Sequence, residues 1–478
     1  MSRRAARTPR PATPRRGPRA RAMGSRVAMP TERTIASTTL LAFVVPALTV
    51  AALATVRPAP IEDPVRPPST TDLRRATVVC APALAGVESD QVSATTADPD
   101  ASGTLVLRHD EDREMYLSGG EVDTLSEAGY AVLVGEDEVA PGLVAARYGE
   151  GAAAACIQPA GDQWFTGVGA GAEHTSVLEL VNPDGGPAVA DITVLGPDGE
   201  VEAPGLRGLT IRGQRLLRVD LAQEVPQRDE LTVRVQVSRG RLAAFMVDRI
   251  DELGRGENSA DWLPAQSEPR ETSYLLGLGA KPGQRTLVVA NGGADQARVT
   301  IRLVSPRSEF APSGLEELVV PPASTRTLDL AKVLGSANAR GVVGLRVDAD
   351  QPVTATLRTL AAGDLFHAIS GAPLTARAGL VLGEGPKRLV LAGAESVTDL
   401  EIVVRDGSGT ELEPVLARVQ PGTAVRVRLP SEARYAELDP DGVALVAAVE
   451  SGPPGLAVVP LSELVLSSEV PDVRPALY

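Results

Sequence analysis

The feature of this sequence that most constrains its fold is an internal repeat with a period of 109 residues. A shift of this length places Leu178–Asn182 on Leu287–Asn291, and Val219–Ala222 on Leu328–Ala331, without a gap. A third, looser copy contains Leu389–Ala392 and has Gly393 where the others have asparagine. Because each copy of such a repeat is one structural unit, we expect three successive domains of about 100 residues.

The repeats have the pattern of β-strands. Leu231–Val237 alternates apolar and polar residues with a period of two, which buries one face of a strand and exposes the other. The turn-forming segments Ser238–Gly240 and Asp348–Pro352 follow such runs and predict hairpins. Short helical turns are expected only at Asp220–Val225 and Asp329–Leu334. The predicted fold class is therefore all-β, with tandem immunoglobulin-like β-sandwiches stacked as a rod.

The amino-terminal segment predicts a membrane topology. Residues 1–33 contain ten Arg and a single acid, Glu32, and read as a disordered basic tail. Residues 34–56 carry no charge and are long enough to cross a bilayer as one transmembrane helix. Basic residues before a first span keep that end in the cytoplasm, so the bulk of the chain is expected outside it, at the plasma membrane. The alternative is a signal peptide cleaved near Ala54, which would give a secreted protein.

Charge limits the partners. The whole chain has a net charge of −14, and the part after the basic tail has −23. An acidic chain of this kind is not attracted to nucleic acid, so no nucleic-acid partner is expected. The expected partners are the lipid bilayer, through residues 34–56, and an unknown envelope protein or polysaccharide.

Domain boundaries follow from composition and from the repeat. The Pro-rich linker at 57–71 precedes a first β domain at 72–163. Repeats 1, 2 and 3 are expected at 164–268, 269–374 and 375–478. The chain has only two cysteines, Cys80 and Cys156, and in an oxidising compartment such a pair predicts a disulfide that closes the first domain.

Residue types that carry chemistry are sparse. His109, His174 and His367 lie in separate units with no triad spacing, so no catalytic residue is predicted. Two cysteines and three scattered histidines predict no metal centre and no cofactor. Acid-rich turns such as Asp439–Gly442 fit ordinary turns, with calcium binding left open.

Three aromatic residues are the candidate contact site. Trp164, Phe165 and Trp262 precede the first two repeats. As exposed groups they would stack on a glycan or contact a partner protein; the other interpretation is that they cover a domain junction.

The layout resembles an uncharacterised family of actinobacterial, membrane-anchored envelope proteins, defined as a domain of unknown function with tandem β-sandwich repeats. The matching features are the basic tail, the apolar span, Cys80, and Cys156 followed by Gly161–Gly167 with its Trp-Phe pair. The resemblance covers about residues 72–460 and implies location and fold, because the family has no established activity.

From these patterns we expect a non-catalytic, extracytoplasmic cell-envelope scaffold or adaptor, and not an enzyme. A glycan-binding accessory factor in envelope polysaccharide assembly is the alternative. A hydrolase with scattered carboxylates is the third hypothesis, which the few aromatic residues make weaker.

Overall fold

The computed structural model describes residues 37–55, 69–87, 90–108, 112–126, 129–251, 258–279, 281–452 and 455–470. The chain divides into two units, residues 1–67 and residues 68–478. The predicted basic tail and most of the predicted linker lie outside the described residues.

In the first unit the described element is helix α1, Ser37–Thr55, which contains Pro46. It falls within the predicted span at 34–56. Among the described residues, however, no helix combines the length and the apolar character needed to cross a membrane. The predicted transmembrane helix is thus not supported, and the anchor stays a prediction.

The second unit is built from strands whose side chains alternate between core and surface, as the sequence pattern predicts. In β21, Ala297–Val304, the buried residues Val299, Ile301 and Leu303 alternate with exposed polar ones. This alternation puts one strand face into a core and leaves the other in water. The fold is all-β in this unit, as predicted, while an immunoglobulin-like identity stays a prediction.

The first β-sandwich consists of two four-stranded antiparallel sheets over one apolar core. In order of pairing the strands are β2 (Arg75–Cys80), β7 (Ala131–Glu136), β4 (Gly103–Arg108) and β5 (Arg113–Leu117), then β6 (Asp123–Leu125), β3 (Gln91–Thr96), β8 (Leu143–Gly149) and β9 (Ala152–Ala155). A disulfide joins Cys80 to Cys156, which confirms the predicted pair. It connects the end of β2 in one sheet to the residue after β9 in the other.

The second sandwich follows the same plan. Its strands are β10 (Asp162–Val168), β16 (Leu231–Arg239), β12 (Ala188–Gly196), β13 (Gly199–Val201) and β14 (Leu209–Ile211), then β15 (Arg215–Asp220), β11 (His174–Asn182), β17 (Ala243–Asp251) and β18 (Asn258–Leu263). The helical turn α2, Leu221–Glu224, follows β15, and the Asp220 carboxylate caps it by accepting from the Ala222 N–H at 3.0 Å.

The third sandwich contains one strand that belongs to both of its sheets. Its strands are β19 (Arg270–Leu276), β20 (Gln284–Asn291), β21, β22 (Glu309–Phe310), β23 (Leu318–Val320), β24 (Ser324–Asp329), β25 (Gly344–Ala361) and β26 (Asp364–Ile369), with α3 (Ala331–Leu334) after β24. The amino-terminal half of β25 pairs with β19 and β21, and its carboxyl-terminal half pairs with β20 and β26.

The predicted hairpins at these places are wrong. Asp348–Pro352 lies inside the continuous strand β25, and Ser238–Gly240 connects β16 to β17, which lie in different sheets. Turn-forming residues here allow the chain to cross from one layer of a sandwich to the other, and the same composition is typical of a tight hairpin turn.

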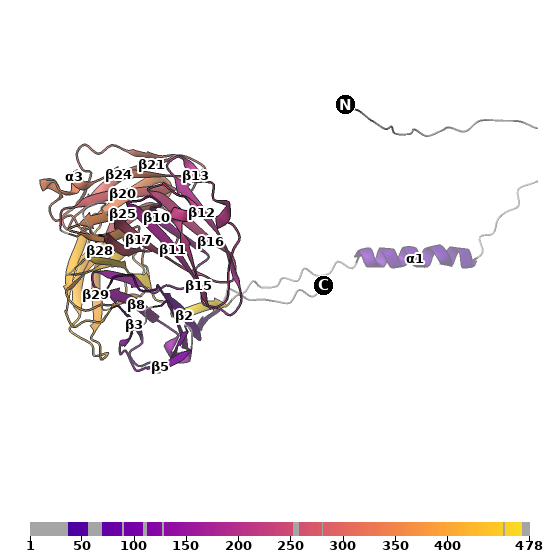
Figure 1. Cartoon of the computed structure of the whole chain (residues 1–478). Helices are drawn as coiled ribbons and strands as arrows, with labels where there is room; N and C mark the ends of the chain where they lie inside the picture. Colours follow the sequence, from indigo (N-terminus) through magenta and orange to yellow (C-terminus); the bar gives the residue numbers. More distant parts are fainter. Residues whose placement is uncertain are drawn as a thin grey trace, which may run out of the picture. The chain divides into compact units, whose positions relative to one another are not determined.

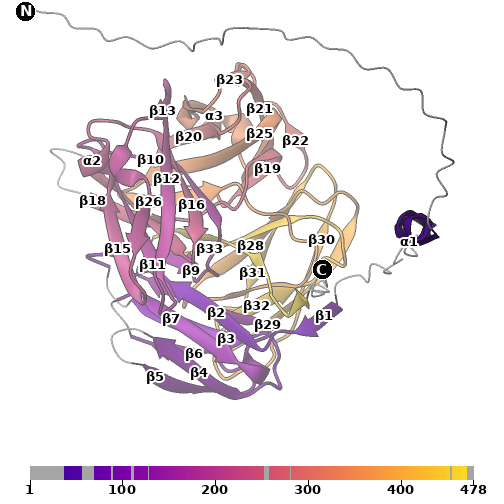
Figure 2. The ribbon, with the colours of Figure 1, turned by 90° about the vertical axis from the view of Figure 1, so that its right-hand side faces the viewer.

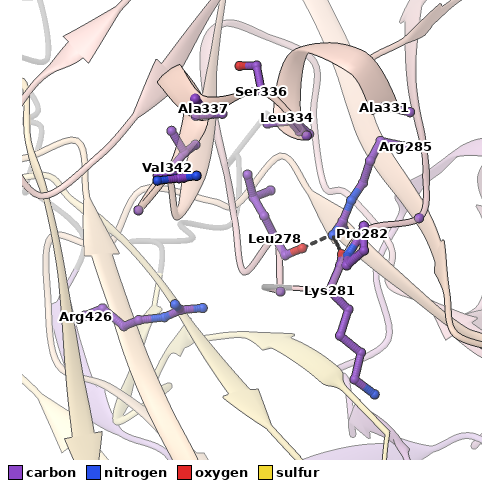
Figure 3. A pocket seen from close by; sticks show the side chains of 16 residues that line it. Leu278, Lys281, Pro282, Arg285, Ala331, Leu334, Ser336, Ala337, Val342 and Arg426 are labelled. Atoms are coloured by element: carbon purple, nitrogen blue, oxygen red, sulfur yellow. Dashed lines mark hydrogen bonds between the residues drawn. The ribbon is translucent and has the colours of Figure 1, made fainter.

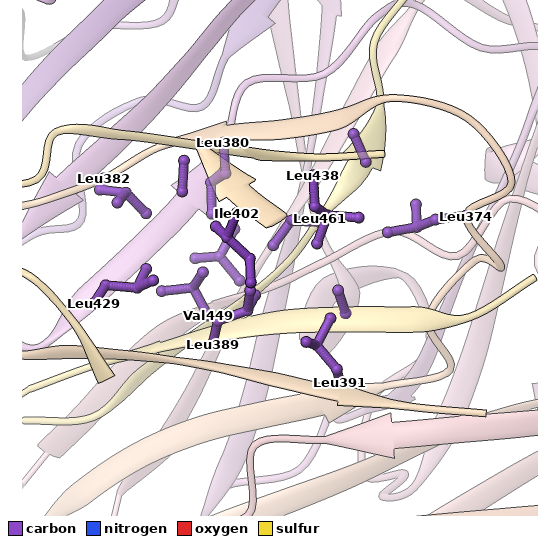
Figure 4. Packing of buried hydrophobic residues seen from close by; sticks show 14 of the residues in the cluster. Leu374, Leu380, Leu382, Leu389, Leu391, Ile402, Leu429, Leu438, Val449 and Leu461 are labelled. Atoms are coloured by element: carbon purple, nitrogen blue, oxygen red, sulfur yellow. The ribbon is translucent and has the colours of Figure 1, made fainter. Parts of the chain in front are cut away.

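The fourth sandwich completes the set. Its strands are β30 (Val415–Val419), β29 (Thr398–Arg405), β32 (Tyr435–Leu438), β27 (Ala378–Val381) and β35 (Ser462–Glu463), then β31 (Ala424–Leu429), β28 (Lys387–Ala392), β33 (Val446–Ser451) and β34 (Ala457–Pro460). Figure 4 shows its core, where Leu389 and Val449 of one sheet face Ile402 and Leu438 of the other.

All four sandwiches share one strand topology. The second strand of each copy, β3, β11, β20 or β28, lies at the centre of a sheet. The last strand of each copy, β9, β18, β26 or β34, forms an edge of that sheet. The first predicted domain therefore has the strand order of the three predicted repeats, which its sequence did not indicate.

The four sandwiches close into a ring. The edge strands β9, β18, β26 and β34 touch one another in succession, and β34 returns to β9. Figures 1 and 2 both show the purple first sandwich beside the yellow fourth. The Tyr148 hydroxyl donates to the Val381 carbonyl at 2.6 Å across this seam, and β1 (Ser69–Asp72) pairs with β36 (Ser467–Val470). The predicted rod is therefore wrong, because the first copy packs against the last.

Candidate functional site

The predicted aromatic contact site is not on the surface. Trp164, Phe165 and Trp262 are 3%, 0% and 2% exposed. The Trp164 ring lies next to Gly292 of the third sandwich and under the Arg234 guanidinium, 4.7 Å from the ring centroid. Trp262 belongs to the apolar cluster between the first and second sandwiches. Trp164 and Trp262 thus fill domain junctions, and Phe165 lies in the core of the second sandwich, so the predicted glycan or partner contact through them is corrected.

The junction between the second and third sandwiches instead contains a buried ionic network around Asp248. This residue of β17 is fully buried. Its Oδ1 accepts from the Ser176 hydroxyl at 2.6 Å and lies 2.8 Å from His174 Nε2. Its Oδ2 lies 3.0 Å from His367 Nε2, which comes from β26 of the third sandwich. Contacts with the two imidazoles hold the pKa of Asp248 well below its ordinary value, against the effect of burial.

A second carboxylate lies on the other side of His367. Asp261 Oδ2 of β18 is 3.5 Å from His367 Nδ1. Burial alone would lower the pKa of His367, but the two carboxylates outweigh it and raise the pKa to about 9. Burial raises the pKa of Asp261 to about 6, with His367 opposing the shift. At neutral pH the arrangement is therefore an imidazolium between two carboxylates.

Arg358 closes the outer end of the network. Its guanidinium, from β25, lies 3.1 Å from His174 Nδ1 and forms a two-point ion pair with Glu230. Each charged group thus has a partner from the neighbouring sandwich, and the two sandwiches are joined by ionic contacts as well as by packing. Buried pairs of this kind fix geometry, because breaking one leaves an uncompensated charge.

The sequence prediction missed this network. His174 and His367 were predicted to be separate, and they meet only because the second and third sandwiches pack together. The sequence contains only an indirect indication of the network. Asp248 follows the apolar run Ala243–Val247, and Asp261 directly precedes Trp262, so each places a charge in an apolar strand. A charge in a buried strand needs a partner, even though its identity cannot be read from the sequence.

The network contains histidines and aspartates, the residue types that often bind metals, but they are not arranged as a metal centre. Among the residues that the structure describes, no three His, Cys, Asp or Glu side chains are arranged to hold a metal ion. The acidic turns use their carboxylates locally. Asp98 Oδ1 accepts from the Asp100 N–H at 2.9 Å, and Asp439 Oδ1 accepts from the Asp441 N–H at 3.0 Å.

An open pocket lies at the junction between the first and fourth sandwiches. It has a volume of about 510 Å³, and its walls carry Ser93, Thr124, Tyr148, Glu384 and Arg434. Arg434 and Glu384 pair with each other at 3.0 Å, and Ser93 and Thr124 lie 3.1 Å apart. Hydroxyl groups, an aromatic ring, the Arg434–Glu384 pair and the exposed Glu150 give this pocket a polar wall without an excess of positive charge, which suits a polar, uncharged ligand.

Residues 144–430 match a family described as a family of unknown function (DUF5719). No curated protein matches the chain. The matched residues cover more than half of the chain and extend from the first sandwich into the fourth.

Proposed function

The chain belongs to the DUF5719 family of unknown function, and from its own structure we propose that it is a non-catalytic, extracytoplasmic scaffold or adaptor of the cell envelope. One observation carries this proposal: the buried ionisable groups around Asp248 bind one sandwich to the next. These groups pair with one another and so hold the sandwiches together. The resulting ring has loops and domain junctions at which a partner could bind.

The proposed location rests on two features. The disulfide between Cys80 and Cys156 is of the kind that persists in oxidising compartments. The apolar side chains of α1, among them Phe43 and Leu53, are exposed, and the segment follows ten arginines. Within this proposal α1 is part of the single-pass anchor predicted at 34–56 or of an export signal removed near Ala54, and in both cases the ring lies outside the cytoplasm.

Crosslinking in intact cells tests the scaffold role. Envelope proteins recovered with the full-length chain, and lost when the chain is removed, would support it. The recovery of cytoplasmic proteins alone would contradict it. Turnover of an envelope substrate by the purified protein, abolished by neutralising one carboxylate, would establish the hydrolase hypothesis instead.

The pocket between the first and fourth sandwiches favours a second candidate function, the binding of a neutral glycan. Its hydroxyls and the Tyr148 ring are the groups that sugars use for hydrogen bonding and stacking. Calorimetric titration with envelope polysaccharide fractions tests it. Thr124→Arg, which fills the pocket, should abolish binding, and Leu416→Arg at an exposed site of β30 should not.

A further inference from the structure

A second junction pocket, between the third and fourth sandwiches, is lined by cations. It has a volume of about 450 Å³, within the range of small-molecule sites. Lys281, Arg285, Arg340 and Arg426 line it, and its described walls contain no Asp or Glu. This is unexpected in a chain with a net charge of −14 and only three lysines. Figure 3 shows Arg426 reaching in from β31, opposite the segment that contains Leu278 and Arg285.

Arg285 is the buried cation of this pocket. It is 6% exposed, and its guanidinium donates to the carbonyls of Leu278 and Lys281 and to the Thr359 hydroxyl, at 2.6 to 2.7 Å. All three acceptors are neutral. No carboxylate within the described part of the chain pairs with Arg285, and burial lowers its pKa. The Phe366 ring lies 5.6 Å from the guanidinium, but no carboxylate neutralises this cation beside the pocket.

The other three cations differ in how they are held. Arg426 pairs with Glu450 through both carboxylate oxygens, while its buried Nε has no partner among the described residues. Lys281 and Arg340 are exposed and form no ion pair in the part of the chain that the structure describes. Two exposed cations at the surface and the buried Arg285 beneath them give a positive field that converges on the cavity.

The pocket between the first and fourth sandwiches is a natural comparison. It is formed by corresponding elements, and Thr124 of β6 contributes to it as Arg426 of β31 does here. That pocket has Glu384 opposite its Arg434. Corresponding positions of the fold therefore have four cations and no carboxylate at one junction, and Arg434 with Glu150 and Glu384 at the other, which indicates a difference in ligand.

We propose that the pocket between the third and fourth sandwiches binds a small phosphate monoester. Guanidinium and ammonium groups match the charge and the hydrogen-bonding oxygens of a phosphate. The cavity volume admits a small ester, and the negative charge of the rest of the chain repels long polyanions. The proposal concerns this pocket alone and does not depend on the scaffold role.

Calorimetric titration of the full-length protein with inorganic phosphate and with glycerol 3-phosphate tests the proposal. Both should bind, and the double variant Lys281→Gln/Arg340→Gln should bind about tenfold more weakly or worse, a loss of about 1.4 kcal/mol. Lys332→Gln is the matched control, because Lys332 is exposed on α3 and does not line the pocket. Its affinity should stay within about twofold of the wild-type value.

The substituted residues are on the surface, so thermal unfolding should be unchanged and loss of folding cannot explain a loss of binding. Absence of any binding by the wild-type protein would overturn the proposal. So would equal weakening in the Lys332 control, or binding of neutral glycerol as strong as that of its phosphate. Binding of polyphosphate in preference to the monoester would overturn the assignment to a small ligand.

Discussion

His367 and Asp248 belong to different sandwiches, and their side chains meet through a contact of 3.0 Å between Nε2 and Oδ2 where neither residue is more than 2% exposed. Asp261 lies on the other side of the same imidazole, and Asp248 also contacts His174, which faces Arg358. Protonation of His367 therefore affects the stability of the junction between the second and third sandwiches.

We expect the free energy of unfolding to fall as the pH rises from 6.5 to 9. The pKa of His367 is raised from an ordinary value of 6.5 to about 9 in the folded protein. Its stabilising effect is thus complete below pH 6.5 and is lost as the pH passes through 9, with a loss on the order of 3 kcal/mol. Urea unfolding across this range measures it. His367→Gln should flatten the dependence, and an unchanged slope in that variant would contradict the assignment.

The repeat asparagines should be structural. The Asn182 side-chain amide donates to the carbonyls of Gly186 and Ile211, and the Asn291 amide donates to those of Asp295 and Val320. For each asparagine, one of these hydrogen bonds spans four residues and the other spans 29. Replacing either buried asparagine by alanine leaves these carbonyls without a partner and should cost about 1–3 kcal/mol in denaturant unfolding.

Asn338→Ala is the control for that experiment, since Asn338 is exposed. Its effect should be within about 0.5 kcal/mol of zero. Equal effects of all three substitutions would show that the two buried amides have no special role.

Much of this fold can be predicted from the sequence, because strands and local turns depend on nearby residues. The period-two run at Leu231–Val237 lies in β16, and the helical turns expected at Asp220–Val225 and Asp329–Leu334 contain α2 and α3. The sequence repeat aligns Asn182 with Asn291, and the structure gives the reason: both side chains form the same local hydrogen bonds.

Properties that depend on packing between distant segments could not be predicted. The first sandwich keeps the topology of the repeat but has Thr96, not asparagine, at the end of β3. The ring depends on contacts such as that between Tyr148 and Val381, which are 233 positions apart. His174 and His367 approach the same Asp248 carboxylate only because the second and third sandwiches pack together.

The disulfide should make a large contribution to stability. Cys80 and Cys156 are 76 residues apart, and closing a loop of this length is worth about 4 kcal/mol in the chain-entropy model. Thermal unfolding before and after reduction measures the loss. Thiol titration of the unfolded, unreduced protein should find no free thiol, and two free thiols would disprove the bond.

The contact between Trp164 and Gly292 should tolerate no added methyl group. A Cβ at position 292 would lie 2.4 Å from the Trp164 ring, so Gly292→Ala must displace a buried indole. We expect a loss of about 1–3 kcal/mol in denaturant unfolding. Gly185→Ala, where no atom lies within 4 Å of the new Cβ, is the control and should be nearly neutral.

Small-angle X-ray scattering from residues 68–478 tests the closed ring most directly. A compact unit of this length should have a radius of gyration of about 22 Å and a symmetric distance distribution. A much larger radius with a long tail of distances would mean that the sandwiches extend as a rod, and would contradict both the ring and the pocket between the first and fourth sandwiches.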